Sequence, residues 1–330
     1  MSSTTSPSLI DMPDLALKEI FGHVGWKSLN TLRLVSKDLC HFIDIVKPKI
    51  RIDSLRIKIA PKSVQIELNS SCRKSKIEIL EHENSTYTIS GKKQIYQGPT
   101  PFLSVTMEIL EALLRRQNGP IGKFQLEIDD KYSKGINQEF LETFLKLIGS
   151  LGPSLRVSHF DLEGSGPQAF QLLARLDSKI LKKISISRAF MKLEEIRNNE
   201  LMMLEQWKCA EELRTFGYYF SVPIQEFVHF GIAEFHITSV SGDDLAYLKE
   251  KYSNSSNFKS STIHYSRLMD SKDLDQILGK PFENNEEFNE KIWYFKCADS
   301  NFALFLFFGR ILFRFVRVPI SKVPKVKEFN

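Results

Sequence analysis

The hydrophobic positions of residues 10 to 48 repeat with the spacing of short amphipathic helices. Apolar residues three and four positions apart share one helix face, so each such run predicts a helix with one buried stripe. The first run is Leu17, Ile20, Phe21 and Val24. The second is Leu29, Leu32, Leu34 and Val35, and the third is Leu39, Phe42, Ile43 and Val46. We therefore expect three short helices in this segment.

Residues typical of helix ends separate these runs. Pro13 suits the first turn of the first helix, where its missing N–H is harmless. Gly25 is typical of a helix end, and Ser36 is a good N-cap for the third helix. Pro48 then ends the third helix.

From about Ile50 the pattern changes to short runs that alternate apolar with polar residues, which predicts β-strands. These runs are "IRIDSLRIKI", "SVQIEL", "SKIEIL" and "STYTIS". Residues 102 to 116 then have helical spacing.

Beyond residue 120 the predicted strands and helices alternate. Strands are expected at residues 123–129, 155–164, 181–187, 213–220 and 232–240. Helices are expected at residues 137–151, 167–176, 198–210, 224–230 and 241–255. Near the end of the chain, strands are expected again at residues 291–297, 302–308 and 311–318. Such alternation fits right-handed crossovers onto a parallel sheet. It also fits a curved α/β solenoid of the leucine-rich-repeat kind, although no strict repeat consensus is present.

The three N-terminal helices have more apolar surface than they can bury among themselves. A segment of about 35 residues is too short to form its own core. Such helices can lay one face into a partner's groove, with anchors at i, i+3, i+4 and i+7. An interface of this kind buries on the order of 800 Å² on each partner. The alternative is that the helices dock on the sheet of their own chain.

Composition places the chain among ordinary globular proteins, because 42% of its 330 residues are hydrophobic and 26% are charged. Lys and Arg number 45 and Asp and Glu 40, which gives a formal net charge of +5. This excess is small and spread along the chain, so it gives little support to nucleic-acid binding.

Cysteine usage and the N-terminus favour a reducing compartment. Cys40, Cys72, Cys209 and Cys297 lie far apart, without the spacing of a metal site. The N-terminus lacks the basic and apolar regions of a signal peptide. We therefore expect reduced thiols and a cytoplasmic or nuclear location. The most apolar window, residues 302–318, contains arginines and is shorter than the about 20 apolar residues of a membrane helix.

No motif of an enzyme active site is present. The chain contains no G-x-S-x-G, P-loop, G-x-G-x-x-G, H-E-x-x-H or EF-hand pattern. The acidic pairs Asp129-Asp130 and Asp243-Asp244 lie where loops or helices begin, so we interpret them as helix caps. We expect no catalytic residue, no cofactor and no metal ion.

The N-terminal segment resembles an F-box, whose general pattern is L-P-x-E-(hydrophobic)-x-x-x-I, a short leucine-rich helix, and V-(S/C)-(K/R)-x-W. The matching positions are occupied by Pro13, Leu17, Ile20, Leu29, Leu32, Val35, Ser36 and Lys37. The sequence departs from the pattern at Met12, where Leu is usual, at Leu15, where Glu is common, and at Leu39, where Trp is usual.

The C-terminal part is similar to a set of nematode F-box proteins of the F-box A type, in which an FTH domain follows the F-box. The similar segments are "LMMLEQWKCAEELRTF" (201–216), "IQEFVHFGIAEFHITSVSGDDLAYLKEKY" (224–252) and "WYFKC" (293–297).

This resemblance implies a non-catalytic substrate-recognition subunit of an SCF-type cullin-RING E3 ubiquitin ligase. Such a subunit binds a Skp-type adaptor through its F-box and a target protein through its C-terminal domain. Holding the target near the ubiquitin-conjugating enzyme raises its effective concentration. The residues expected to contact the adaptor are Pro13, Leu15, Leu17, Ile20, Phe21, Leu29, Leu32 and Val35.

The expected fold is α+β and α/β, with a three-helix F-box followed by an irregular leucine-rich-repeat-like receptor domain that has β-strands at both ends. The expected segments are a disordered tail (1–9), the F-box (10–48), a β-rich connecting segment (49–101) and the FTH-like receptor domain (102–330). Two other functions stay open. One is an interaction scaffold without a ligase role, and the other, less favoured, is an RNA-binding regulator.

Overall fold

The computed structural model describes residues 9–24, 28, 32, 35–46, 50–70, 73–128, 134–164, 167–188, 193–196, 200–269 and 274–324. The chain divides into two compact units, with residues 1–181 in unit 1 and residues 182–330 in unit 2. Each unit contains both helices and strands.

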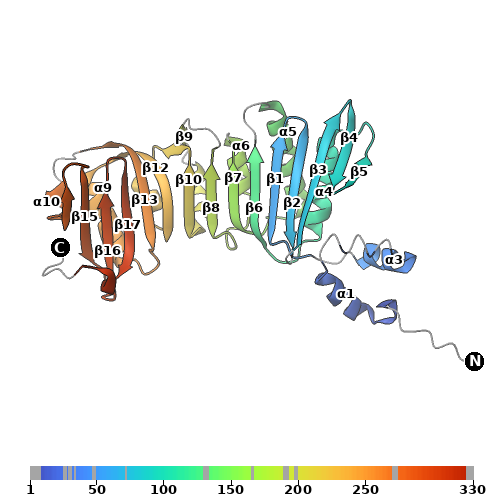
Figure 1. Cartoon of the computed structure of the whole chain (residues 1–330), viewed down its shortest axis with the longest axis horizontal. Coiled ribbons are helices and arrows are strands. Elements are labelled where there is room, and N and C mark those ends of the chain that lie inside the picture. Colours follow the sequence, from blue (N-terminus) through green and yellow to red (C-terminus); the bar gives the residue numbers. More distant parts are fainter. Residues whose placement is uncertain are drawn as a thin grey trace, which may run out of the picture. The chain divides into compact units, whose positions relative to one another are not determined.

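Unit 1 begins with short helices, which are η1 (Leu9–Asp11), α1 (Asp14–Gly22) and α3 (Lys37–Val46) (Figure 1). Helix α1 starts at Asp14, so Pro13 is the N-cap residue and lies one position before the first turn in which it was expected. The predicted cap of α3 is confirmed, because the Leu39 N–H donates a hydrogen bond to Ser36 Oγ at 3.1 Å. Most of the second predicted helix, including Leu29 and Leu34, falls outside the described residues, so the three-helix arrangement stays a prediction.

The sheet of unit 1 combines an antiparallel meander with a parallel part. Its strands are β1 (Ser54–Ala60), β2 (Ser63–Ser70), β3 (Arg73–His82), β4 (Ser85–Ser90), β5 (Lys93–Tyr96), β6 (Ile121–Ile128) and β7 (Val157–Glu163). Strands β1 to β5 pair in chain order and antiparallel. Strand β1 also pairs parallel with β6, and β6 pairs parallel with β7. Figure 1 therefore shows the spatial order β5-β4-β3-β2-β1-β6-β7.

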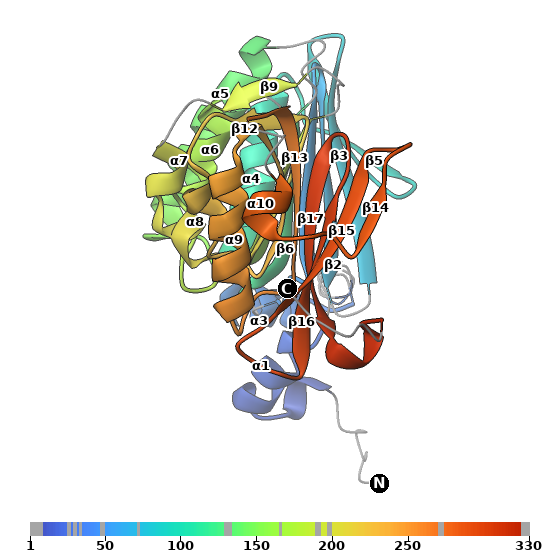
Figure 2. The same ribbon diagram turned by 90° about the vertical axis from the view of Figure 1, so that its left-hand side faces the viewer.

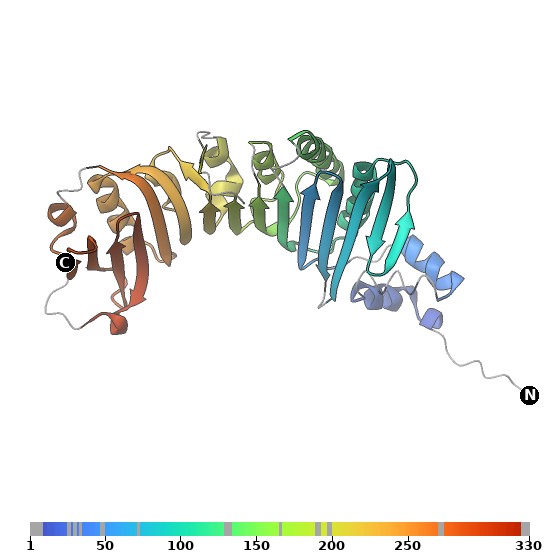
Figure 3. The same cartoon turned by 45° about the horizontal axis from the view of Figure 1, so that its top comes forward.

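Three helices cover one face of this sheet, namely α4 (Phe102–Arg115), α5 (Lys134–Leu151) and α6 (Pro167–Leu173) (Figure 3). In β1 every second residue is buried, at Leu55, Ile57 and Ile59. The residues between them face the opposite side, where polar side chains pair across the strands. Arg56 Nε donates a hydrogen bond at 2.6 Å to Glu127 Oε1 on the adjacent strand β6.

The sheet of unit 2 begins with parallel strands and ends with an antiparallel meander. Its main parallel strands are β8 (Lys183–Ser187), β10 (Glu212–Phe216), β12 (Ile232–Val240) and β13 (Ser260–Leu268). The meander consists of β14 (Glu283–Asn285), β15 (Glu290–Lys296), β16 (Phe302–Phe308) and β17 (Leu312–Pro319), and β17 pairs antiparallel with β13. Two short strands, β9 (Glu194–Ile196) and β11 (Tyr218–Phe220), pair parallel with each other.

The helices of unit 2 lie on one face of its sheet (Figure 2). They are α7 (Glu200–Met203), α8 (Glu205–Cys209), α9 (Gly242–Asn254) and α10 (Leu274–Leu278). Unit 2 also contains the 3₁₀ turns η2 (Ile224–Phe227) and η4 (Ile320–Lys322). Ser241 and Asp244 form a capping box at the start of α9, in which each side chain accepts a hydrogen bond from the other's backbone N–H. This confirms helix capping for Asp244, whereas Asp129 and Asp130 fall outside the described residues.

An aromatic cluster fills part of the core of unit 2. The Phe227 and Phe235 rings stack with their centroids 3.9 Å apart, and the Trp207 ring contacts Phe227 edge-on at 5.8 Å. The Trp207 indole N–H donates a hydrogen bond at 3.2 Å to the backbone oxygen of Glu226, so its polar atom is satisfied inside this apolar cluster.

Two predicted elements of unit 2 are interrupted, which corrects the prediction. The helix expected at residues 198–210 is divided at Leu204 into α7 and α8. The strand expected at residues 213–220 is divided at Gly217 into β10 and β11. Gly217 has a φ of 80°, and a Cβ at this position would lie 2.8 Å from Arg188 Cβ, so only glycine fits there.

Candidate partner-binding surfaces

The residues predicted to contact an adaptor divide by exposure. On the surface lie Pro13, Leu15, Ile20 and Val35. Leu15 is 79% exposed, Val35 is 66% exposed and Ile20 is 37% exposed. Leu15 and Ile20 belong to α1, and Val35 lies just before α3, so each is an apolar side chain of the N-terminal segment that a partner can reach.

Two other residues of the predicted set are buried within the chain. Leu17 and Phe21 are 1% and 0% exposed, and the Phe21 ring packs edge-on against Phe42 at 5.7 Å. Leu39 and Ile43 of α3, the helix that carries Phe42, are buried as well. In this structure Leu17 and Phe21 hold the helices in place and are covered by their own chain.

For two further residues of the predicted set, the structure does not decide between contact with a partner and support of the helices. Leu32 is half-buried, and Leu29 falls outside the described residues. Which of the eight residues a partner contacts therefore stays a prediction.

Sequence reasoning missed one exposed apolar residue of the same segment, Ile45, which is 66% exposed near the end of α3. The sequence contains one sign of this exposure, which is the position of Ile45 relative to the apolar stripe of its helix. Ile45 lies beside the helical stripe of Leu39, Phe42, Ile43 and Val46 and not within it. An apolar residue outside the buried stripe of a short helix is a candidate for contact with something else.

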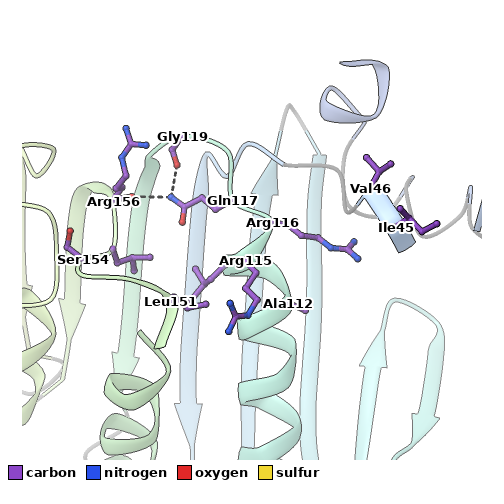
Figure 4. A pocket seen from close by; sticks show the side chains of 12 residues that line it. Ile45, Val46, Ala112, Arg115, Arg116, Gln117, Gly119, Leu151, Ser154 and Arg156 are labelled. Carbon is purple, nitrogen blue, oxygen red and sulfur yellow. Dashed lines mark hydrogen bonds between the residues drawn. The ribbon is translucent and has the colours of Figure 1, made fainter. Parts of the chain in front are cut away.

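Ile45 lies at a cavity of about 760 Å³ in unit 1. The cavity is bounded by the end of α3, the end of α4 with the segment that follows it, and the connection from α5 to β7 (Figure 4). Its lining includes Ile45, Leu151 and three arginines, Arg115, Arg116 and Arg156. We call it the α3–α4 pocket.

Hydrogen bonds fix the segment after α4 that lines this pocket. The Gln117 side-chain amide donates to the backbone oxygen of Gly119 at 2.6 Å and to that of Arg156 at 3.3 Å. Arg115, in the last turn of α4, forms an ion pair with Glu111 at 2.7 Å. The Gln117 hydrogen bonds attach the segment between α4 and β6 to Arg156, the residue that precedes the neighbouring strand β7. This part of the pocket wall is therefore fixed in position.

A second candidate surface lies on the helix-free face of the unit 2 sheet. Alternate residues of the C-terminal meander form there a strip of half-buried apolar side chains, the open-face strip, made of Ile292, Tyr294, Phe305, Phe307 and Val316. The Tyr294 and Phe305 rings contact each other at 5.5 Å. Burial raises the pKa of the Tyr294 hydroxyl, and the nearby Glu283 carboxylate raises it further.

Two histidines lie on neighbouring strands of the same face. His236 and His264 are directly opposite each other, with ring centroids 6.4 Å apart, and His236 Nε2 shares a hydrogen bond with Ser266 Oγ at 2.9 Å. Burial lowers the pKa of His236, and the neighbouring His264 lowers it further. This favours a neutral His236 near pH 7.

The described residues show no grouping suited to metal chemistry, since no three His, Cys, Asp or Glu side chains gather closely enough to hold an ion. Within the same described part of the chain, no helix combines the length and the apolar character needed to cross a membrane.

Comparison with protein families finds two matches in the chain. Residues 9–51 match the F-box domain, and residues 138–282 match the FTH domain. Leu15, Val35 and Ile45 lie within the first match, whereas the open-face strip lies beyond the second. The α3–α4 pocket draws its lining from both matched regions and from the segment between them.

Among curated proteins, F-box A protein 224 from Caenorhabditis elegans is 21% identical to this chain over 303 residues. The aligned part covers 90% of this chain and 76% of that protein, so the similarity extends across both units. No solved structure matches the chain.

Proposed function

We propose that this chain, an F-box protein that also carries an FTH domain, is a substrate-recognition subunit of an SCF-type cullin-RING ubiquitin ligase. Its F-box would bind a Skp-type adaptor, and the region from about residue 50 onward would bind a target protein. We assign it no chemistry of its own. It would act by proximity, because a target held beside the conjugating enzyme reacts at a raised effective concentration.

The observation that carries this proposal is the F-box match, together with the exposed apolar side chains that the structure gives to that segment. Leu15 and Val35 are 79% and 66% exposed, and both lie inside residues 9–51. Their exposure leaves both side chains accessible to a partner, and their place inside the F-box match supports the adaptor as that partner. The adaptor interface would then rest on Pro13, Leu15, Ile20 and Val35, while Leu17 and Phe21 support the helices from beneath.

The finer description of the fold belongs to the same proposal. It includes a third F-box helix around residues 28–34 and a receptor domain that follows the architecture of an irregular leucine-rich repeat. A cytoplasmic or nuclear location is proposed as well, because the ligase machinery that this function requires operates there.

The proposal is tested by purifying the full chain with a Skp-type adaptor and comparing single substitutions of equal chemistry. Leu15→Asp and Val35→Asp are expected to reduce the retained adaptor about tenfold or more, because each places a carboxylate in the apolar interface. Met203→Asp is the matched control, since Met203 is 70% exposed but lies in unit 2. Equal adaptor retention by all three variants would refute the assigned interface.

The two other functions predict different results in the same experiment. An interaction scaffold without a ligase role would retain its partners in both F-box variants and would bind no adaptor. An RNA-binding regulator would be retained on a polyanion column and released steeply as salt increases.

A further inference from the structure

The lining of the α3–α4 pocket is uneven in charge. Six of its lining residues are apolar and three are arginines, whereas no aspartate or glutamate lines it. Its volume of about 760 Å³ lies in the upper part of the range of about 300–1,000 Å³ that is typical of ligand pockets. A pocket of this composition suits an occupant that has both apolar and negatively charged groups.

The arginines do not converge on one point. In Figure 4 the Arg116 side chain extends towards Ile45 and Val46, whereas Arg156 lies at the opposite end, beyond Gln117. One small anion cannot contact both guanidinium groups in this arrangement. The spacing instead favours an extended occupant with separate negative charges near the two ends.

The dipole of helix α4 can explain the presence of two of the three arginines. Arg115 and Arg116 are at the C-terminal end of α4, where a positive charge also stabilises the helix, and Arg115 is paired with Glu111. Arg156 is exposed and lies outside any helix, in the connection that leads into β7. An explanation from the helix dipole of α4 therefore does not extend to Arg156.

From these observations we infer that the α3–α4 pocket binds an extended acidic peptide segment of the target protein. The apolar side chains of the segment would cover Ile45 and Ala112, and its negative groups would pair with Arg116 and Arg156. A nucleic acid fits less well, because no aromatic side chain lines the pocket to stack on a base. The inference rests on the proposed function only in assigning the segment to the target.

The chemistry leaves two sources for the negative groups, carboxylates and phosphorylated side chains. We would measure both by fluorescence polarisation with the full chain, using short labelled peptides in which leucine alternates with a variable residue. The variable residue is glutamate in the first peptide, phosphoserine in the second and glutamine in the third. A labelled uridine oligonucleotide is the fourth probe.

Three variants locate the binding. Arg156→Glu replaces a positive charge with a negative one, and Ala112→Trp fills the pocket. Both positions are exposed, so the fold tolerates the changes. Arg267→Glu is the matched control, because it alters the net charge equally at an exposed position of unit 2. A thermal unfolding curve for each variant verifies that it is folded.

We expect the acidic or the phosphorylated peptide to bind, more weakly at high salt, and the neutral peptide not to bind. Arg156→Glu and Ala112→Trp should each weaken that binding about tenfold, and Arg267→Glu should leave it unchanged. The inference is overturned by equal binding of the neutral peptide, by an equal loss in Arg267→Glu, or by pocket-dependent binding of the oligonucleotide alone. Adaptor retention is measured separately. If the unmodified chain binds the adaptor but neither the acidic nor the phosphorylated peptide, the pocket inference is refuted and the proposed ligase role is unaffected.

Discussion

Ile50 forms an isolated parallel β-bridge with Gln117. The Ile50 N–H donates to the backbone oxygen of Arg116 at 2.6 Å, and the Ile50 oxygen accepts a hydrogen bond from the Asn118 N–H at 2.7 Å. The chain that leaves the F-box region is thereby attached to the segment that follows α4. That segment also forms the wall of the α3–α4 pocket, so the two features depend on the same few backbone hydrogen bonds.

The first prediction concerns the side chain of this bridge. Ile50 is 1% exposed, and Ile50→Ala should lower the free energy of unfolding by about 2–5 kcal/mol because it leaves a cavity. Urea unfolding measures this change. Ile45→Ala is the control, since Ile45 is 66% exposed and its truncation should change stability by no more than about 0.5 kcal/mol. Equal effects would show that the buried position of Ile50 does not matter for stability.

A second prediction separates support from contact within α1. Leu17→Ala should destabilise the chain by about 2–5 kcal/mol, because Leu17 is 1% exposed. Leu15→Ala should leave the unfolding curve within about 0.5 kcal/mol of the wild type and weaken adaptor binding, because Leu15 is 79% exposed. The two quantities are measured on the same preparations by thermal unfolding and adaptor titration. A Leu15→Ala variant that binds the adaptor normally would remove Leu15 from the interface.

The strands and helices with strong periodicity could be predicted from the sequence. Strands β12 and β16 begin and end where their alternation predicts, at residues 232–240 and 302–308. The strand β13, "SSTIHYSRL", was not predicted because only a few of its residues are apolar. It is nevertheless a central strand, paired with β12 and β17, and its polar residues Thr262 and His264 lie on the helix-free face. Pairing with neighbours far along the chain determines such a strand, and local periodicity does not reveal it.

The candidate site was predictable as a segment but not as a surface. The apolar spacing identifies Leu17, Ile20 and Phe21 as one stripe, yet Ile20 is 37% exposed whereas the other two are buried. The difference depends on where the neighbouring helix lies, which the spacing does not contain. The α3–α4 pocket could not be predicted either, because Ile45, Arg116 and Arg156 are far apart in the sequence and line one cavity only in the folded chain.

A third prediction concerns the polar face of the unit 1 sheet. Glu127 is 6% exposed and accepts a hydrogen bond from Arg56, which also forms an ion pair with it. The hydrogen bond to Glu127 raises the pKa of Arg56, so the guanidinium stays charged. Arg56→Ala should destabilise the chain by about 1–3 kcal/mol, because the buried carboxylate loses its main donor. The figure is below that of a fully buried pair, because the Arg56 side chain is 43% exposed to solvent.

The control for this pair is Arg51→Ala. Arg51 also pairs with a carboxylate, that of Asp53 at 3.1 Å, but its side chain is 76% exposed. Its removal should cost less than about 1 kcal/mol, and the small effect should disappear at high salt. Urea unfolding at two salt concentrations distinguishes the pairs, and equal costs for Arg51→Ala and Arg56→Ala would contradict the role of burial.

The last prediction concerns the pH dependence of unit 2 and His229, whose ring lies tilted against that of Phe230 with the centroids 3.9 Å apart. Burial lowers the pKa of His229 below its ordinary value of 6.5, although a hydrogen bond to the backbone oxygen of Trp207 and the charge of Glu226 act in the opposite direction. The unfolded chain therefore binds this proton at a higher pH than the folded chain does. The stability contributed by neutral His229 is complete above about pH 6.5 and is lost as the pH falls towards the lower, folded-state pKa.

Urea unfolding at a series of pH values between about 7.5 and about 5.5 tests this sign. The wild-type chain should become less stable as the pH falls, and His229→Asn should reduce that slope without abolishing it, since His236 is shifted in the same direction. Phe227→Leu is the control, because it weakens the aromatic cluster of Trp207, Phe227 and Phe235 without removing a titratable group. It should lower stability at every pH and leave the slope unchanged. A His229→Asn variant with the full wild-type slope would assign the pH dependence to other groups.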